Sequence, residues 1–148
     1  MPETFLDNSE NVYRGSAACC AHAYLLAPIK TLLQSFRNTG SALDLGCGNG
    51  SLSHELSKLG FAVHGIDRSQ SGIQIARETF PRVQFLLGDV ENELSSDPLP
   101  AESFDVVVST EVVEHLYYPR RLIHNAFRLL KPSGHFIVST PYHAMLRT

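Results

Sequence analysis

The segment Asp44–Gly50, which reads DLGCGNG, constrains this chain more than any other feature of its sequence. It follows a short apolar run and precedes a helical pattern that begins near Ser51. Three glycines between a strand and a helix permit a tight turn and let the backbone come close to a ligand. The helix that follows would point its free amide groups at the same ligand. The segment predicts a ligand-binding turn, although by itself it leaves open an ordinary strand-to-helix turn.

Short apolar runs and helical stretches alternate through the rest of the chain, which is the pattern of βαβ units. Strands are expected at about 41–45, 61–66, 83–87, 104–109 and 134–139, with helices at about 51–59, 70–79 and 120–130. The run 104–108 is almost entirely apolar, so we expect a central strand covered on both faces. Proline and glycine in Lys131–Gly134 predict a turn before the last strand. The pattern indicates an α/β fold, a Rossmann-like parallel sheet with helices on both faces.

The first 40 residues differ in pattern from the domain that follows. Residues 1–15 are polar and show no sustained period, so a loose arm anchored by Tyr13 is expected. From about 17 to 36, apolar residues recur at three- and four-residue steps, which predicts an amphipathic helix. Pro28 could split this helix, because an interior proline removes a helical hydrogen bond. We therefore divide the chain into an N-terminal arm and helix, residues 1–40, and an α/β domain, residues 41–148.

Composition narrows the classes of partner. The 148 residues are 43% hydrophobic, which suits one globular domain. The formal net charge is −3, so nucleic acid is not expected as a partner. The three cysteines are an odd number without metal-ligand spacing, and neither a disulfide framework nor a zinc site is expected. No run approaches the roughly 18 apolar residues of a membrane span, so we expect a soluble protein. The cysteine pattern suits a reducing cytoplasm.

Two further acidic residues stand at the carboxyl ends of expected strands. Asp67 lies about 20 residues after Gly46, where a carboxylate can accept both hydroxyls of a ribose. Asp89 follows the strand at 83–87, where it could meet an adenine amino group. Each has a structural alternative, since Asp67 could cap the next helix, for which Ser69 is an equal candidate, and Asp89 could belong to a turn. With Asp44, these acids converge on one crevice at the carboxyl edge of the sheet.

The glycine spacing distinguishes between nucleotide cofactors. A dinucleotide fingerprint, G-x-G-x-x-G, requires glycine at position 51, where Ser51 stands. The turn also has no lysine–serine pair to hold a triphosphate, which excludes a P-loop. A nicotinamide-dependent oxidoreductase is therefore disfavoured.

With these features the sequence resembles the class I S-adenosylmethionine-dependent methyltransferases. The resemblance covers roughly residues 40–142 and rests on the segments 43–50, 65–67, 88–90, 104–111 and 129–136. It implies a strand order of 3-2-1-4-5 and S-adenosylmethionine as the cofactor. The methionine part would lie near the glycine turn, the ribose hydroxyls at Asp67 and the adenine edge at Asp89. The resemblance assigns these residues to the cofactor: Asp44, Gly46, Cys47, Gly48, Asn49, Gly50, Asp67, Arg68, Asp89, Val90 and Thr110.

The segment 110–116, TEVVEHL, resembles most closely the branch that includes the ubiquinone-biosynthesis O-methyltransferases. On a helix, Glu111, Glu114 and His115 would share one face, being three and four residues apart. The resemblance makes the three residues candidates for catalysis, with His115 as the general base for a hydroxyl acceptor. Two alternatives remain open. The trio could ligate a divalent ion, or the two glutamates could flank a helix N-terminus while His115 packs locally.

The family normally continues beyond the point at which this chain stops, Thr148, with another helix and an antiparallel pair of strands. The strand at 134–139 would then be an exposed apolar edge, which invites pairing with another chain or a second copy. We expect methyl transfer from S-adenosylmethionine to an oxygen or nitrogen of a small molecule. The alternative is a truncated fragment, or a module that binds the cofactor without catalysis.

Overall fold

The computed structural model describes residues 20–34, 40–94 and 99–141. The expected arm at residues 1–15, with Tyr13, lies outside these ranges. Within them the chain forms α1 (Cys20–Gln34), β1 (Gly40–Leu45), α2 (Ser51–Lys58), β2 (Phe61–Asp67), α3 (Gln70–Thr79), β3 (Gln84–Leu87), β4 (Phe104–Thr110), the 3-10 turn η1 (Val113–His115), α4 (Pro119–Leu129) and β5 (Leu130–Ser139). In the described part of the chain, no helix combines the length and apolar character needed to cross a membrane.

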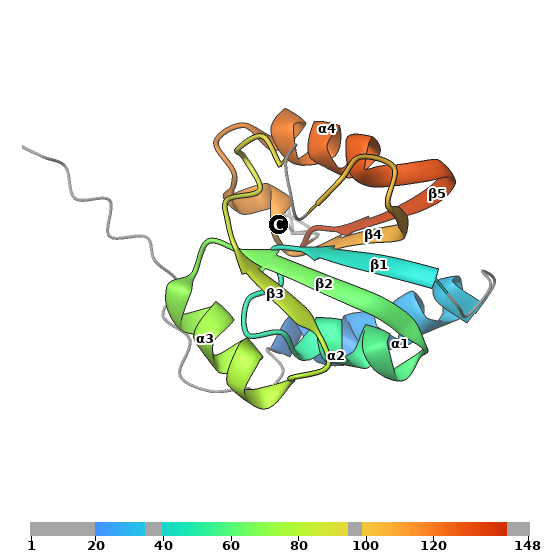
Figure 1. The fold of residues 1–148 in the computed structure, drawn as a ribbon, viewed down its shortest axis with the longest axis vertical. Helices are drawn as coiled ribbons and strands as arrows, with labels where there is room; N and C mark the ends of the chain where they lie inside the picture. Colours follow the sequence, from blue (N-terminus) through green and yellow to red (C-terminus); the bar gives the residue numbers. More distant parts are fainter. Residues whose placement is uncertain (1–19, 35–39, 95–98, 142–148) are drawn as a thin grey trace, which may run out of the picture.

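The five strands of the described residues form one parallel sheet in the order β3-β2-β1-β4-β5, which confirms the expected fold (Figure 1). In the register of the sheet, Asp44 of β1 is level with Gly65 of β2 and Val108 of β4. Because all strands run in one direction, the segments that follow β1, β2, β3 and β4 leave the sheet at the same edge. This edge is where parallel sheets place their ligands.

Two apolar cores cover the two faces of the sheet. Alternate residues of a strand point to opposite faces, so Ala42 packs toward α1, α2 and α3, while Leu43 and Leu45 pack toward α4. Figure 1 shows these three helices on one side of the sheet and α4 on the other. The strand β4 lies between β1 and β5, and its Val106–Val108 are at most 2% exposed, as a strand covered on both faces requires.

The expectation that Pro28 could split the first helix is wrong. The helix α1 runs without interruption through Pro28. Next to the proline, Ile29 and Leu33 are 3% and 1% exposed against the first core. Burying two large aliphatic side chains contributes roughly 1.5–3 kcal/mol each, which offsets the hydrogen bond that the proline removes.

The expected turn at Lys131–Gly134 is not a separate element before the last strand. β5 already begins at Leu130, which pairs with Phe104, and pairing resumes at His135 opposite Val106. The four residues 131–134 therefore form a bulge opposite a single residue, Asp105. Lys131 donates from Nζ to Asp105 Oδ2 at 2.9 Å across this bulge.

Leu56→Ala tests the first core. Leu56 of α2 is fully buried, and its truncation removes apolar contacts and leaves a cavity under the sheet. We expect the free energy of unfolding, measured by urea denaturation, to fall by about 2–5 kcal/mol. Leu32→Ala makes the same chemical change at a side chain that is 49% exposed, and it should cost about 1 kcal/mol or less. Equal losses in the two variants would contradict this placement of the core.

Candidate functional site

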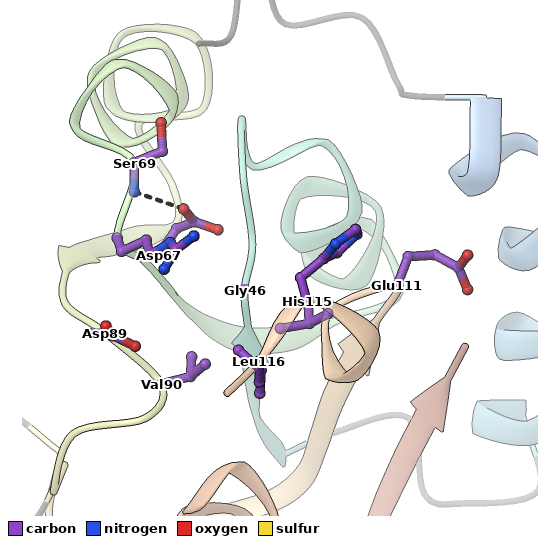
Figure 2. A pocket seen from close by; sticks show the side chains of 10 residues that line it. Gly46, Asp67, Ser69, Asp89, Val90, Glu111, His115 and Leu116 are labelled. Atoms are coloured by element: carbon purple, nitrogen blue, oxygen red, sulfur yellow. Dashed lines mark hydrogen bonds between the residues drawn. The ribbon is translucent and has the colours of Figure 1, made fainter. Parts of the chain in front are cut away.

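A crevice opens at the carboxyl edge of the sheet, between the segment that follows β3 and the segment that follows β4. Figure 2 shows Asp67 and Asp89 on one side of Gly46 and His115 on the other. The residues that line the crevice are Gly46, Asp67, Arg68, Ser69, Asp89, Val90, Glu111, Val112, His115 and Leu116.

The glycine turn forms the floor of the crevice. The amides of Gly46 and Cys47 both donate to the carbonyl oxygen of Ile66, at 2.8 and 3.0 Å, which joins the ends of β1 and β2. Gly46 has a φ of +83°, and a Cβ there would lie 2.4 Å from Val112 Cγ2. A side chain at position 46 would strain the backbone and would require Val112 to move, which favours glycine there. Close approach of the backbone to a ligand, as the sequence predicts, is what this geometry permits.

Asp67 is held at the crevice by two backbone amides. Its Oδ2 accepts from the Gly48 amide at 2.9 Å, and its Oδ1 accepts from the Ser69 amide at 2.7 Å. The helix cap of α3 is Ser69, whose Oγ accepts from the Gly72 amide at 3.2 Å. The capping alternative for Asp67 is therefore wrong, and its carboxylate is oriented between the glycine turn and α3.

Asp89 and Val90 form the wall opposite Leu116. The Glu91 amide donates to Asp89 Oδ1 at 2.8 Å, so the turn role that the sequence left open is present. The same aspartate also lines the crevice, and one role does not exclude the other. Val90 is 6% exposed and belongs to the second core.

Asp44 lies below the glycine turn and is only 1% exposed. Ser53 of α2 donates from Oγ to Asp44 Oδ2 at 2.6 Å. Burial raises the pKa of the Asp44 carboxyl to about 7, the Ser53 hydrogen bond lowers it, and the nearby charge of Asp67 adds to the rise. Burial also raises the pKa of the neighbouring Cys47 thiol, which is 2% exposed and packs in the first core.

The expectation that Glu111, Glu114 and His115 share one helical face is wrong. Glu111 precedes η1 and has a φ of +55°, so it stands outside any helix. Its carboxylate accepts from Ser139 Oγ at 2.8 Å and from Tyr24 Oη at 3.4 Å, and Figure 2 shows it pointing away from Asp67. His115 does not pack locally, because its side chain is 68% exposed, and its Nε2 lies 3.9 Å from Glu114 Oε1.

Of the residues that the sequence assigns to the cofactor or to catalysis, the structure brings seven to the crevice wall: Gly46, Asp67, Arg68, Asp89, Val90, Glu111 and His115. Asp44, Cys47, Gly48, Asn49, Gly50, Thr110 and Glu114 lie behind or beside it. Among the described residues, no group of three histidine, cysteine or carboxylate side chains is arranged to hold a metal ion. The sequence reasoning missed Ser69, Val112 and Leu116 as lining residues. Their proximity to Asp67 and His115 along the chain was the only available signal.

The fold and the crevice define a class of protein, the Rossmann-like domains that bind a nucleotide-containing ligand at the carboxyl edge of a parallel sheet. A family model described as a methyltransferase domain matches residues 37–147. The chain therefore belongs to the S-adenosylmethionine-dependent methyltransferases, as the sequence resemblance indicated.

Relatives of known name and structure agree with this family. A ubiquinone biosynthesis O-methyltransferase of Marinobacter nauticus is 38% identical over 103 residues, which cover 67% of this chain and 43% of the relative. The crystal structure of the PH0226 protein from Pyrococcus horikoshii is 30% identical, with a TM-score of 0.72 over 85% of this chain and 60% of that one. An S-adenosylmethionine-dependent methyltransferase from Mesorhizobium loti is 28% identical, with a TM-score of 0.65 over 77% of this chain and 52% of that one. The chain spans about two fifths of the length of the curated relatives it matches.

Asp44→Asn tests the buried carboxyl. A carboxyl whose pKa rises on folding binds its proton more tightly in the folded state, so it lowers the free energy of unfolding as the pH rises from about 4 to about 7. Asparagine removes this ionisation and keeps an acceptor for Ser53. We expect Asp44→Asn to raise the melting temperature of the ligand-free protein, and by more at about pH 8 than at about pH 5.

Asp105→Asn is the control for this experiment. The hydrogen bond from Lys131 lowers the pKa of Asp105, so ionised Asp105 stabilises the folded state and its replacement should lower the melting temperature at about pH 8. If Asp44→Asn lowered the melting temperature equally at both pH values, the carboxyl would be ionised in the folded protein and the assignment would fail.

Proposed function

We propose that this chain binds S-adenosylmethionine in the crevice and transfers its methyl group to an oxygen or nitrogen of a small molecule. The observation that carries the proposal is the placement of two carboxylates, Asp67 and Asp89, around a glycine turn at the carboxyl edge of the sheet. The family of the chain supports the choice of cofactor. The name of the Marinobacter nauticus relative favours oxygen as the acceptor atom.

The crevice fits an adenosine. Each oxygen of Asp67 already accepts one backbone amide and keeps a lone pair for a ribose hydroxyl. Asp89 uses Oδ1 for the Glu91 amide, which leaves Oδ2 for an adenine amino group. Val90 and Leu116 line the crevice from opposite walls and would contact the faces of the base.

The methionine part of the cofactor would lie along the glycine turn, above Asp44. The raised pKa of Asp44 has burial as its main cause, and an ammonium group nearby would stabilise the charged carboxylate. The amides of the glycine turn and the Asp44 carboxylate would thus hold the methionine part, while Asp67 and Asp89 hold the adenosine.

His115 is the proposed general base. S-adenosylmethionine supplies an electrophilic methyl carbon on its sulfonium sulfur. In-line transfer of this carbon to the acceptor atom would release the sulfur as a thioether, and the imidazole of His115 would take up the acceptor proton. The remaining contribution of the chain is to hold the reacting atoms in attack geometry. The carboxylate of Glu111, bound to Ser139 and Tyr24, supports the wall rather than the proton transfer.

Asp67→Ala tests the cofactor site. Removing the carboxylate should weaken the binding of S-adenosylhomocysteine by about 1.5–3 kcal/mol, typical for hydrogen bonds to a charged group, as measured by titration calorimetry. Glu78→Ala removes an equal charge from an exposed position of α3 and should leave affinity unchanged. Unchanged affinity in Asp67→Ala would remove this residue from the site. Tight binding of NADH by the wild-type chain, without binding of S-adenosylhomocysteine, would overturn the cofactor assignment.

His115→Ala tests the base. Turnover of a hydroxyl acceptor should fall by roughly 10²–10⁴-fold, the usual contribution of a general base, while affinity for S-adenosylhomocysteine stays within about twofold. The assay is transfer of a labelled methyl group to phenols and amines of low molecular weight. His124→Ala, an exposed histidine of α4, is the control. A wild-type rate in His115→Ala would assign the proton transfer to another group.

A further inference from the structure

The two walls of the crevice come from strands that are not neighbours. Asp89 and Val90 follow β3, at one edge of the sheet, whereas Val112, His115 and Leu116 follow β4, on the far side of β2 and β1. No ladder of the sheet joins these two walls. Figure 1 shows the segment after β3 passing along the sheet to the start of α4, and the contacts there supply the missing connection.

Asn125 of α4 binds the segment that carries the first wall. Its Nδ2 donates to the carbonyl of Val90 at 2.9 Å and to that of Asn92 at 2.7 Å, and its Oδ1 accepts from the Leu94 amide at 3.4 Å. The side chain is 2% exposed. A buried amide that uses both of its N–H groups on one segment holds that segment in a single position, because each alternative leaves a buried polar group without a partner.

Glu91 binds the segment that carries the second wall. Its carboxylate accepts from the amide of Tyr118, three residues after His115, and its own carbonyl accepts from Arg121 Nη1 at 3.2 Å. Glu91 is 7% exposed, and it directly follows Asp89 and Val90. Glu91, on the first wall segment, thus accepts hydrogen bonds from Tyr118, just before α4, and from Arg121 in the first turn of α4.

We infer that Asn125 and Glu91 form a positioning pair that holds the adenine wall of the crevice at a set distance from the wall that carries His115. Neither side chain contacts the proposed cofactor or the acceptor. They act through Val90 on one wall and through Tyr118 on the other. This inference rests on the proposed function only for its effect on ligand binding, since the link between the walls is a property of the chain alone.

Hydrogen exchange of backbone amides in the ligand-free protein tests the link directly. Glu91→Ala should speed exchange at residues 113–118, on the opposite wall, and Asn125→Leu should speed it at residues 89–94. Glu91→Gln retains an acceptor for the Tyr118 amide and should restore slow exchange. Glu93→Ala makes the same truncation at an exposed glutamate of the same segment and serves as the control. Exchange at 113–118 that is equally slow in Glu91→Ala, Glu93→Ala and wild type would overturn the inference.

Ligand binding tests the consequence. Glu91→Ala should weaken the binding of S-adenosylhomocysteine by about fivefold to tenfold, which is comparable with the loss of one hydrogen bond. Glu91→Gln should weaken it by less than about twofold. The preference for S-adenosylhomocysteine over S-inosylhomocysteine should fall in Glu91→Ala, since a displaced Asp89 discriminates less well at the base. A purely structural role would lower the melting temperature without changing this preference, and that result would overturn the inference. If wild type binds neither compound, the proposed function fails while the exchange result still decides the link.

The Glu91 pair of variants keeps the experiment decisive if Asn125→Leu does not fold. Glu91→Ala and Glu91→Gln differ in the acceptor offered to Tyr118, and only loss of that acceptor should loosen the opposite wall. Equal exchange at residues 113–118 in the two variants would show that the Glu91 carboxylate does not hold the opposite wall.

Discussion

Two backbone amides donate hydrogen bonds to one carbonyl oxygen, that of Ile66, and this pair of bonds shapes the crevice. The carbonyl of Ile66, the next-to-last residue of β2, accepts from both Gly46 and Cys47, so the turn after β1 bends over the end of β2. The bend requires a positive φ and an empty Cβ position at Gly46, because Val112 occupies the space beside it. It places the Gly48 amide on Asp67, which sets the orientation of that carboxylate. The same two hydrogen bonds therefore shape the floor of the crevice and set the orientation of Asp67.

One residue of the candidate site, Asp44, lowers the stability of the folded protein. Asp44 keeps a carboxyl in the interior, where Ser53 is a hydrogen-bond partner, and burial raises its pKa to about 7. A buried ionisable group of this kind costs free energy that an apolar residue of similar size would not. In the proposed complex, the cationic part of the ligand above Asp44 would offset this cost. The link between the two walls also buries polar groups. Those of Glu91 and Asn125 lie in an otherwise apolar layer, where each needs a hydrogen-bond partner.

Local patterns were sufficient to predict much of the protein. The alternation of short apolar runs with helical periods predicted the strands and α-helices after residue 40, though not η1. The resemblance to a family implied the strand order, which the structure confirms. Asp67 and Asp89 were predicted at the crevice because a carboxyl-terminal strand end has only one edge to occupy in a parallel sheet. The pattern was less informative at Pro28 and at Lys131–Gly134. At Pro28, burial of Ile29 and Leu33 overcame the local preference of proline, and at residues 131–134 the chain bulges within β5 rather than turning before it.

The sequence by itself determined the class of fold, the glycine turn and the acids beside it, since these depend on residue type and on spacing along one or two adjacent elements. Only the tertiary structure decided the partners of each side chain. Glu111 does not share a helical face with His115, because it lies before η1 in a left-handed conformation and its carboxylate binds Ser139 and Tyr24. Asn125 of α4 binds the segment that carries one crevice wall, because the segment after β3 passes to α4. Contacts between residues far apart in sequence arise from packing of whole elements, and no local periodicity records them.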